Sequence, residues 1–198
     1  MSKKADETRA RILQTTLDLL ASAEPKKTRV SDIAKAAGIS RQALYLYFPT
    51  RSELLIAATK YLDEQVNIDA SLAPSRAAQS GEERLDAFIR AWSAHIPVIY
   101  PIGHALMAMM DTDLEARAAW QDRMQAVRHG CAAVVMALQR DGRLRHDLDQ
   151  GQSTDLLWSL LSVRLWEHLT RDCGWGQIEY CKHITRLAKA ALISDDPE

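Results

Sequence analysis

The chain has 198 residues, of which 47% are hydrophobic and 26% are charged. This composition supports a buried core with a charged surface and argues against a disordered chain. The longest apolar run, at 131–138, is far shorter than the roughly 20 residues that span a bilayer, and residues 1–7 precede no apolar signal segment. Three cysteines are too few for a disulfide framework. We therefore expect a cytoplasmic protein without a membrane span.

The charge is unevenly distributed along the chain. Residues 1–52 contain ten Lys or Arg and five Asp or Glu, which gives a net charge of +5. The remaining residues contain fifteen and twenty-one, which gives −6, so the overall charge of −1 conceals an asymmetry. A basic segment attached to an acidic body indicates a polyanion as the partner of that segment, although an ordinary solvated surface would show the same counts.

Helical periodicity runs through nearly the whole chain, and no segment shows sustained alternation of period two. A first helix ends before Pro25, and shorter helices at 30–37 and 41–47 follow it. We expect further helices near 52–72, 82–96, 101–110, 113–140, 153–171 and 177–193, a loop at 73–81, and a break between Pro97 and Pro101. The sequence predicts an all-α protein of about nine helices, with a three-helix head at 1–50 and a larger helical domain at 51–198.

The segment 30–48 has the spacing of a helix-turn-helix. Ala34 permits two helices to cross closely, Gly38 suits the turn, and Ser40 is a natural N-cap for the second helix. The side chains expected to point inward are Ile33, Ile39, Leu44 and Phe48. The outer face of the second helix would then meet the major groove of DNA.

The side chains of that outer face have the chemistry of base and phosphate contacts. Arg41 can bind guanine and Gln42 adenine through two hydrogen bonds each, while Leu46 suits a thymine methyl. Tyr45 and Tyr47 have hydroxyls that reach phosphates, or they are core aromatics of a small head. The residues predicted to contact DNA are Thr28, Arg29, Arg41, Gln42, Ala43, Tyr45, Leu46, Tyr47 and Arg51.

Residues 9–55 resemble the N-terminal domain of TetR-type bacterial transcription regulators. The resemblance rests on Arg11-Ile12-Leu13, Leu17, Leu20-Ala21, Thr28, Val30, Asp32-Ile33-Ala34, Ala36-Ala37-Gly38-Ile39-Ser40, Leu44-Tyr45, Tyr47-Phe48, Arg51 and Leu54-Leu55. The chain departs from the family pattern at Glu24-Pro25, at Arg29 and at Leu46. The resemblance implies a homodimer on a pseudo-palindromic operator, with recognition helices about 34–36 Å apart. It also implies that a ligand bound in the larger domain, 51–198, releases the DNA.

Two helices near the C-terminus are the predicted dimer surface. The helix at 153–171 is apolar on nearly all sides, and the helix at 177–193 has a stripe of apolar and small residues. With the resemblance, this predicts an isologous four-helix interface, although an intrachain core would produce the same pattern. The predicted interface residues are Leu157, Leu160, Leu161, Ile184, Leu187, Ala188 and Ala191.

Trp, His and Met side chains are spread over the middle helices. Such groups combine an apolar body with adaptable or polar atoms, which suits a pocket for a small hydrophobic or aromatic ligand. Arg164 lies in an otherwise apolar run and could bind a ligand carboxylate or pair with Glu167. Each of these residues, taken alone, is more simply explained as part of the core. The predicted pocket residues are Trp92, His95, His104, Met107, Met110, Trp120, Met124, Arg164 and His168.

The sequence thus predicts a one-component transcriptional regulator that binds double-stranded DNA, most simply a repressor released by a small-molecule effector. The alternatives are an activator, or a regulator with no inducer whose C-terminal domain binds a protein. The His and Cys spacings fit no metal site. No phosphate-binding loop, nucleophile elbow or paired catalytic carboxylates are visible, so neither an enzyme nor a cofactor is expected.

Overall fold

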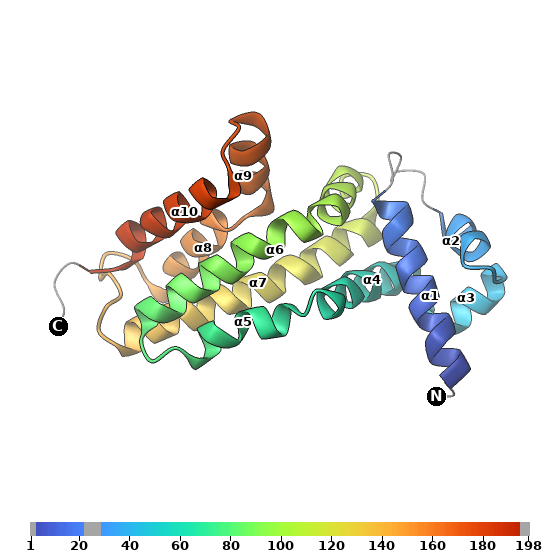
Figure 1. Ribbon diagram of the computed structural model, residues 1–198, viewed down its shortest axis with the longest axis horizontal. Helices are drawn as coiled ribbons and strands as arrows, with labels where there is room; N and C mark the ends of the chain where they lie inside the picture. Colours follow the sequence, from blue (N-terminus) through green and yellow to red (C-terminus); the bar gives the residue numbers. More distant parts are fainter. Residues whose placement is uncertain (1–2, 22–28, 195–198) are drawn as a thin grey trace. The chain divides into compact units, whose positions relative to one another are not determined.

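The computed structural model describes residues 3–21 and 29–194. These residues form an all-α structure, as predicted, in which an isolated bridge between Leu144 and Ile193 is the sole β-type pairing. The elements, shown in Figure 1, are α1 (Lys3–Leu20), α2 (Val30–Ala36), α3 (Arg41–Tyr47), α4 (Arg51–Gln65), α5 (Ile68–Ala77), α6 (Gly81–Met109), α7 (Leu114–Arg140), α8 (Gln150–Leu160), α9 (Val163–Glu167), the π-helical turn η2 (His168–Asp172) and α10 (Gln177–Leu192). Across the described residues, we find no helix that is both long enough and apolar enough to cross a membrane.

The chain divides into two compact units. The first comprises Met1–Val66 and Ile99–Met124, and the second comprises Asn67–Val98 and Gln125–Glu198. Helices α6 and α7 therefore each contribute residues to both units. These units are defined by packing alone. The division by function, into a DNA-binding domain at 1–50 and a ligand-binding and dimerisation domain at 51–198, stays a prediction.

The first unit is built around α1, which packs against α2 and α4, while α2 packs against α3. The apolar stripe of α1 supplies buried side chains at helical spacing, including Ile12, Leu13 and Leu17. Leu54 and Leu55 of α4 are fully buried in the same core. The Arg11 Nε donates to the Ala37 carbonyl at 3.0 Å, which ties α1 to the end of α2.

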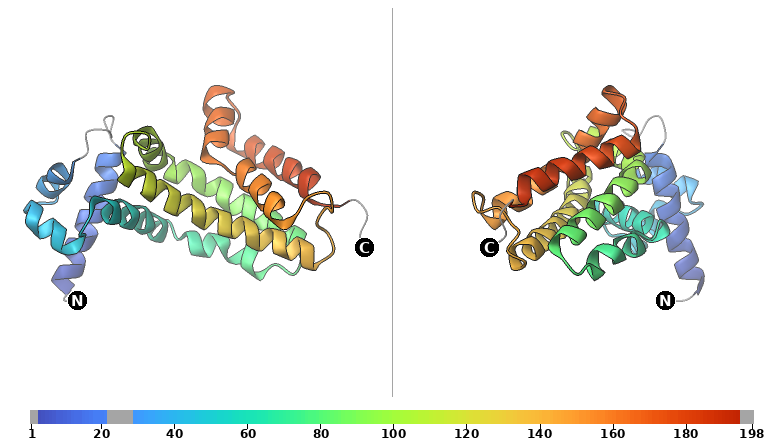
Figure 2. Two further views of the ribbon diagram at one scale, coloured as in Figure 1. Left: turned by 180° about the vertical axis from the view of Figure 1, so that it is seen from behind. Right: turned by 60° about the vertical axis from the view of Figure 1, so that its left-hand side comes forward.

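The second unit packs α10 against α8, as Figure 2 shows from two further directions. The buried face of α10 consists of Tyr180, Ile184, Ala188 and Leu192. The Lys189 ammonium pairs with Asp86 of α6 at 2.7 Å. Asp141 accepts a hydrogen bond from the Gly81 N–H at 2.6 Å and satisfies the start of α6. That backbone donor, together with Arg140, lowers the pKa of the Asp141 carboxyl.

The predicted break between Pro97 and Pro101 is wrong, because α6 runs without interruption through both prolines. Pro97 has no N–H, so the Ser93 carbonyl loses its donor within the helix. The Gln177 side chain of α10 donates to that carbonyl at 2.5 Å instead. Ile96 and Ile102 are buried beside the prolines, so packing favours a continuous helix there.

The predicted helix at 52–72 and the predicted loop at 73–81 are also corrected. The chain leaves α4 at Val66, and Asn67 adopts a left-handed backbone with φ of 51°. The Asn67 side chain then accepts from the Ala70 N–H and starts α5, which continues through Pro74 to Ala77. The Ser75 hydroxyl donates to the Arg84 carbonyl at 3.0 Å and holds this end of α5 in place.

The predicted helix at 153–171 is interrupted after Leu160. The Ser162 hydroxyl accepts from the Leu165 N–H and starts the short helix α9. The indole N–H of Trp92 donates to the Leu161 carbonyl at 2.8 Å, so α6 satisfies a backbone group that the interruption leaves open. After α9 the helix continues as the wider π-helical turn η2, and α10 begins after it.

Candidate nucleic-acid interface

Helices α2 and α3 form the predicted helix-turn-helix. Gly38 has a positive φ of 69°, a conformation that a glycine adopts without steric cost. The Ile39 N–H donates to the Ala34 carbonyl at 3.0 Å and closes the turn. The Ser40 hydroxyl accepts from the Ala43 N–H at 3.0 Å, so Ser40 is the N-cap of α3 as predicted.

Buried apolar side chains fix the angle between the two helices. Ile33 of α2 and Leu44 of α3 are almost completely buried, and Phe48 is 3% exposed. The guanidinium of Arg9 lies 5.1 Å from the centre of the Phe48 ring. The inward orientation predicted for Leu44 and Phe48 is therefore confirmed, whereas Ile39 is half-buried.

The opposite face of α3 is open to solvent. Arg41 and Gln42 are exposed, and Leu46 is 86% exposed. Ala43, Tyr45 and Tyr47 are half-buried. The Arg41 Nη2 donates to the Tyr45 hydroxyl at 3.3 Å, and its guanidinium lies 5.5 Å from the centre of the Tyr45 ring. Tyr45 thus supports the Arg41 head group from one turn further along the helix.

Arg29, at the entrance to α2, is exposed. Its N–H donates to the Asp32 carboxylate at 3.1 Å, which makes Arg29 the N-cap position of α2. This backbone role leaves the guanidinium on the surface of the head. Thr28, also predicted to contact DNA, lies outside the described residues.

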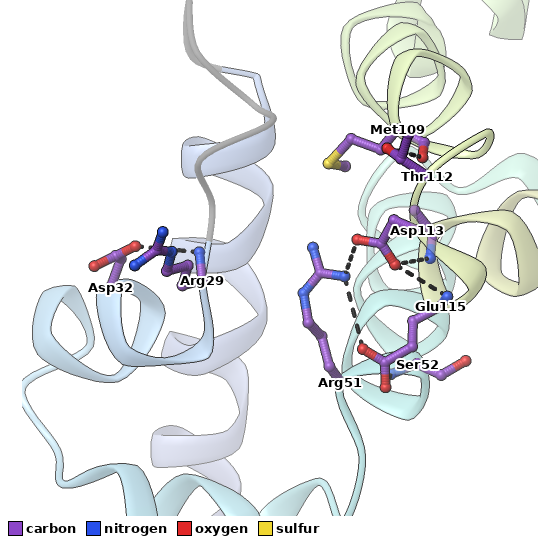
Figure 3. A network of polar contacts seen from close by, with 9 residues as sticks. Arg29, Asp32, Arg51, Ser52, Met109, Thr112, Asp113 and Glu115 are labelled. Atoms are coloured by element: carbon purple, nitrogen blue, oxygen red, sulfur yellow. Dashed lines mark hydrogen bonds and ion pairs between the residues drawn. The ribbon is translucent and has the colours of Figure 1, made fainter.

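Arg51 has partners that the sequence did not indicate (Figure 3). Its guanidinium pairs with the Asp113 carboxylate and lies 3.7 Å from Glu115 Oε2. Asp113 also accepts from the N–H groups of Glu115 and Ala116, at 3.0 and 3.1 Å, and so caps the start of α7. The Arg51 side chain is 15% exposed. Carboxylates therefore already neutralise the charge of Arg51 in this structure, and its contact with DNA stays a prediction.

An open hollow of about 740 Å³ lies beside α3 in the first unit. Its wall carries three arginines together with the two carboxylates that bind Arg51. The lining residues are Arg29, Val30, Ser31, Arg41, Tyr45, Pro49, Thr50, Arg51, Asp113 and Glu115. Sequence reasoning missed Asp113 and Glu115. The Asp-Leu-Glu start of a helix was visible, but the pairing with an arginine 62 residues earlier was not.

The nine predicted pocket residues are shared between the two units. His104, Met107, Met110, Trp120 and Met124 belong to the first, and Trp92, His95, Arg164 and His168 belong to the second. In the first unit, Gly103 lets the Trp120 ring approach α6, since a Cβ at Gly103 would lie 2.9 Å from that ring. His104 is exposed and contacts the Tyr100 hydroxyl at 3.3 Å. In the second unit, the Trp92 and His95 rings are buried 5.5 Å apart.

Arg164 and His168 differ from Trp92 and His95 in their surroundings. Both are exposed, on α9 and η2 respectively. His168 contacts Asp172, which was not among the predicted pocket residues, at 3.0 Å. A ligand role for these two side chains stays a prediction.

The predicted dimer residues also separate into two groups. Leu157, Leu161, Ile184 and Ala188 are buried within one protomer, so they belong to its own core and offer no surface to a partner. Leu160 and Ala191 are half-buried, and Leu187 is 45% exposed. Of the predicted interface residues, these three have surface that a partner could cover, and the interface itself stays a prediction.

Three buried hydroxyls in the second unit were not anticipated. Ser93 of α6, Ser153 of α8 and Tyr180 of α10 each carry a buried side-chain oxygen with no hydrogen-bond partner among the described residues. Burial raises the pKa of the Tyr180 phenol, which keeps it neutral. Among the residues that the structure describes, no group of three or more His, Cys, Asp or Glu is arranged to hold a metal ion.

Comparison with known proteins relates the helix-turn-helix to bacterial transcription regulators. Residues 12–58 match the family described as "Bacterial regulatory proteins, tetR family". The HTH-type transcriptional regulator EthR of Mycobacterium tuberculosis is 28% identical over 141 residues, which cover 69% of this chain and 63% of that protein. The matched region thus spans less than two thirds of the relative's length.

Solved structures share the fold over nearly the full chain. A protein from Rhodococcus sp., described as a TetR-family transcriptional regulator, has a TM-score of 0.74 at 20% identity and covers 94% of this chain and 99% of its own. A transcriptional regulator from Saccharomonospora viridis, solved in complex with choline, has a TM-score of 0.72 at 19% identity and covers 96% and 99%.

The exposed α3 and these matches place the head among the helix-turn-helix units of bacterial transcription regulators. Within that class, residues 12–58 belong to the tetR family of bacterial regulatory proteins. The resemblance predicted from the sequence is confirmed.

Proposed function

We propose that this chain represses transcription as a homodimer bound to a pseudo-palindromic DNA operator. In this proposal residues 1–50 bind DNA, and residues 51–198 bind an effector and the second protomer. The observation that carries it is the division of α3 into a buried face, with Leu44, and an exposed face, with Arg41, Gln42 and Leu46. A helix that packs on the core through one face and exposes the other can enter the major groove of DNA.

The exposed face separates base contacts from phosphate contacts. Arg41 and Gln42 stand at the start of α3, the end of a recognition helix that meets base edges. Leu46 adds an apolar contact for a thymine methyl. Arg29 and the hydroxyls of Tyr45, Tyr47 and Thr28 are then the phosphate contacts that set the position of the head on the duplex.

The first test is selection of bound duplexes from random DNA, followed by titration of the winning sequence at several salt concentrations. We expect a motif with two-fold symmetry, and affinity that falls steeply with salt because phosphate contacts release counterions. Recovery of no shared motif, or an affinity that does not change between low and physiological salt, would contradict the proposal.

We further propose that a small molecule bound in the second unit releases the operator. Buried polar groups almost always have a hydrogen-bond partner, and the unpartnered hydroxyls of Ser93, Ser153 and Tyr180 lie on three helices of this unit. Trp92 supplies apolar surface in the same unit, and His95 supplies a buried imidazole beside it. The choline complex of the Saccharomonospora viridis regulator supports the idea that this fold accepts a small molecule.

Thermal unfolding across a library of small aromatic and quaternary-ammonium compounds tests the effector proposal. A true effector should raise the Tm and weaken binding to the selected operator. The matched variant is Tyr180→Phe, which removes one buried hydroxyl and keeps the ring. We expect Tyr180→Phe to keep or raise the Tm without ligand and to reduce the shift that the ligand causes. If no compound stabilises the protein, regulation through a protein partner becomes the better account.

A further inference from the structure

A carboxylate, an imidazole and a thiol lie next to one another in η2 and at the residue that follows it. His168 Nδ1 is 3.0 Å from Asp172 Oδ2. On the other side of the same ring, His168 Nε2 is 3.8 Å from Cys173 Sγ. All three side chains are exposed, so small molecules in solution can reach the thiol.

The π-helical turn η2 explains why both neighbours reach one ring. In an α-helix, residues four apart share a face, which places Asp172 beside His168. The wider π turn brings residues five apart together, and the Cys173 N–H donates to the His168 carbonyl at 2.9 Å. Gly174 follows with a positive φ of 75° and turns the chain away.

The turn is anchored to the core of the second unit. The indole N–H of Trp166, just before η2, donates to Gln177 Oε1 at 2.9 Å. The Gln177 amide donates in turn to the Ser93 carbonyl of α6 at 2.5 Å. The guanidinium of Arg171 lies 5.5 Å from the centre of the Trp166 ring. These contacts hold the backbone that carries the three reactive side chains.

The order of the three groups defines a proton path. When the Nδ1–H of the neutral imidazole donates its hydrogen bond to Asp172, Nε2 keeps a free electron pair. That electron pair faces the Cys173 thiol and can take its proton. This is the arrangement by which a base and its orienting carboxylate activate a nucleophile.

The two other thiols of the chain are free but placed differently. Cys131 is buried, and burial raises its pKa to about 12, which keeps it protonated and unreactive. Cys181 is half-buried in α10. The three thiols therefore provide an internal comparison within one molecule.

We propose that Cys173 is a covalent attachment site for soft carbon electrophiles of the α,β-unsaturated carbonyl class. The thiol proton moves to His168 Nε2 as Sγ forms a bond to the β-carbon. The electron pair of the C=C bond moves toward the carbonyl, and the α-carbon then takes the proton from His168. The product is a thioether, and the addition consumes neither an oxidant nor a reductant. The proposal does not depend on DNA binding.

The test uses the full chain and N-ethylmaleimide, an electrophile of this class. Brief exposure at neutral pH, followed by peptide mass spectrometry, gives a labelling rate for each cysteine. We expect the order Cys173, then Cys181, with Cys131 unlabelled while the protein is folded. Because Cys173 is also the more exposed thiol, this order alone does not establish the role of His168.

Substitutions of His168 and Asp172 test whether the imidazole accelerates the reaction of Cys173. His168→Gln and Asp172→Asn should each slow labelling of Cys173 by about tenfold and leave Cys181 unchanged. The expected effect is smaller than the roughly 100-fold or more of a positioned catalytic base, because an exposed thiol also reacts without one. Glu167→Gln is the matched control, since it removes the carboxylate next to His168 in the chain and leaves His168, Asp172 and Cys173 in place. In denaturant, wild type and His168→Gln should label at the same rate.

Two results would overturn the proposal. One is a Cys173 rate equal to that of Cys181 in the folded wild-type protein. The other is a Cys173 rate that His168→Gln leaves unchanged while the variant keeps the wild-type Tm and helical circular dichroism. If His168→Gln lowers the Tm, Asp172→Asn in a folded protein decides the question in the same way.

Discussion

Arg41 does not stand alone on the surface of α3, because Tyr45 contacts its guanidinium through both the hydroxyl and the ring. An arginine held in this way loses less conformational freedom when it binds a base. Its charge and its two-pronged geometry can be separated by substitution, since lysine keeps the charge alone.

Replacement of Arg41 by alanine should weaken operator binding by about 1–3 kcal/mol and relax selection at one base position. Arg41→Lys should lose the same selectivity but keep most of the salt dependence. Titration of the wild-type and single-base-variant operators measures both effects. Arg90→Ala, which removes an exposed arginine of α6, is the control and should bind normally. Wild-type selectivity in Arg41→Ala would exclude Arg41 from base readout.

The ion pair of Arg51 with Asp113 gives a second prediction for single residues. Asp113→Asn removes the negative charge but keeps the oxygen that caps α7. Arg51 then loses the closer of its two carboxylate partners and keeps Glu115. The hollow beside α3 also loses a charge that repels phosphates. We expect operator binding to tighten by about 0.5–1 kcal/mol, with a steeper salt dependence.

Asp155→Asn removes a carboxylate that pairs with Arg128 in the second unit and serves as the control. It should leave operator affinity unchanged, as measured by the same titration. If Asp113→Asn weakens binding while its Tm stays at the wild-type value, the ion pair supports the DNA-bound form instead of competing with it.

At the scale of helices, the sequence correctly predicted those elements that are set by residues close to one another in the chain. The turn between α2 and α3 depends on Gly38 and Ser40, which act on backbone groups within five residues. The continuity of α6 could not be predicted in this way. The carbonyl that Pro97 leaves open is satisfied by Gln177, which lies 84 residues further along the chain. The pairing of Arg51 with Asp113 was hidden for the same reason.

The close approach of α6 and α7 in the second unit gives a prediction for a helix pair. A Cβ on Gly130 would lie 2.5 Å from Cζ of the buried Phe88 ring, which is 6% exposed. Gly130→Ala should therefore lower the free energy of unfolding by about 1–3 kcal/mol through overpacking. This exceeds the roughly 0.5–1 kcal/mol that alanine gains in a helix.

Chemical denaturation measures the change, and Phe88→Leu identifies its cause. If the ring is the obstacle, the double variant Gly130→Ala with Phe88→Leu should be more stable than the sum of the two single effects allows. A Tm above that of the wild type for Gly130→Ala would show that the ring moves aside without cost.

For the whole molecule, the predicted dimer surface can be tested on α10 because two exposed apolar residues lie on different sides of it. Leu187 is 45% exposed and Ile178 is 86% exposed. They are nine residues apart, and at about 100° per residue they point in opposite directions. Leu187 belongs to the predicted interface, whereas Ile178 does not, so the same substitution at both sites compares an interface position with a matched surface position.

Leu187→Glu should convert a dimer into a folded monomer, because it places a charge where a partner would have to exclude water. The protomer should keep its helical circular dichroism, since Leu187 is not part of the buried face of α10. Sedimentation measures the mass, and Ile178→Glu should remain dimeric. Leu187→Glu should also bind a full operator only as weakly as a half-site, because one protomer contributes one recognition helix. A dimer that survives Leu187→Glu with wild-type affinity would mean that the two protomers associate through another surface.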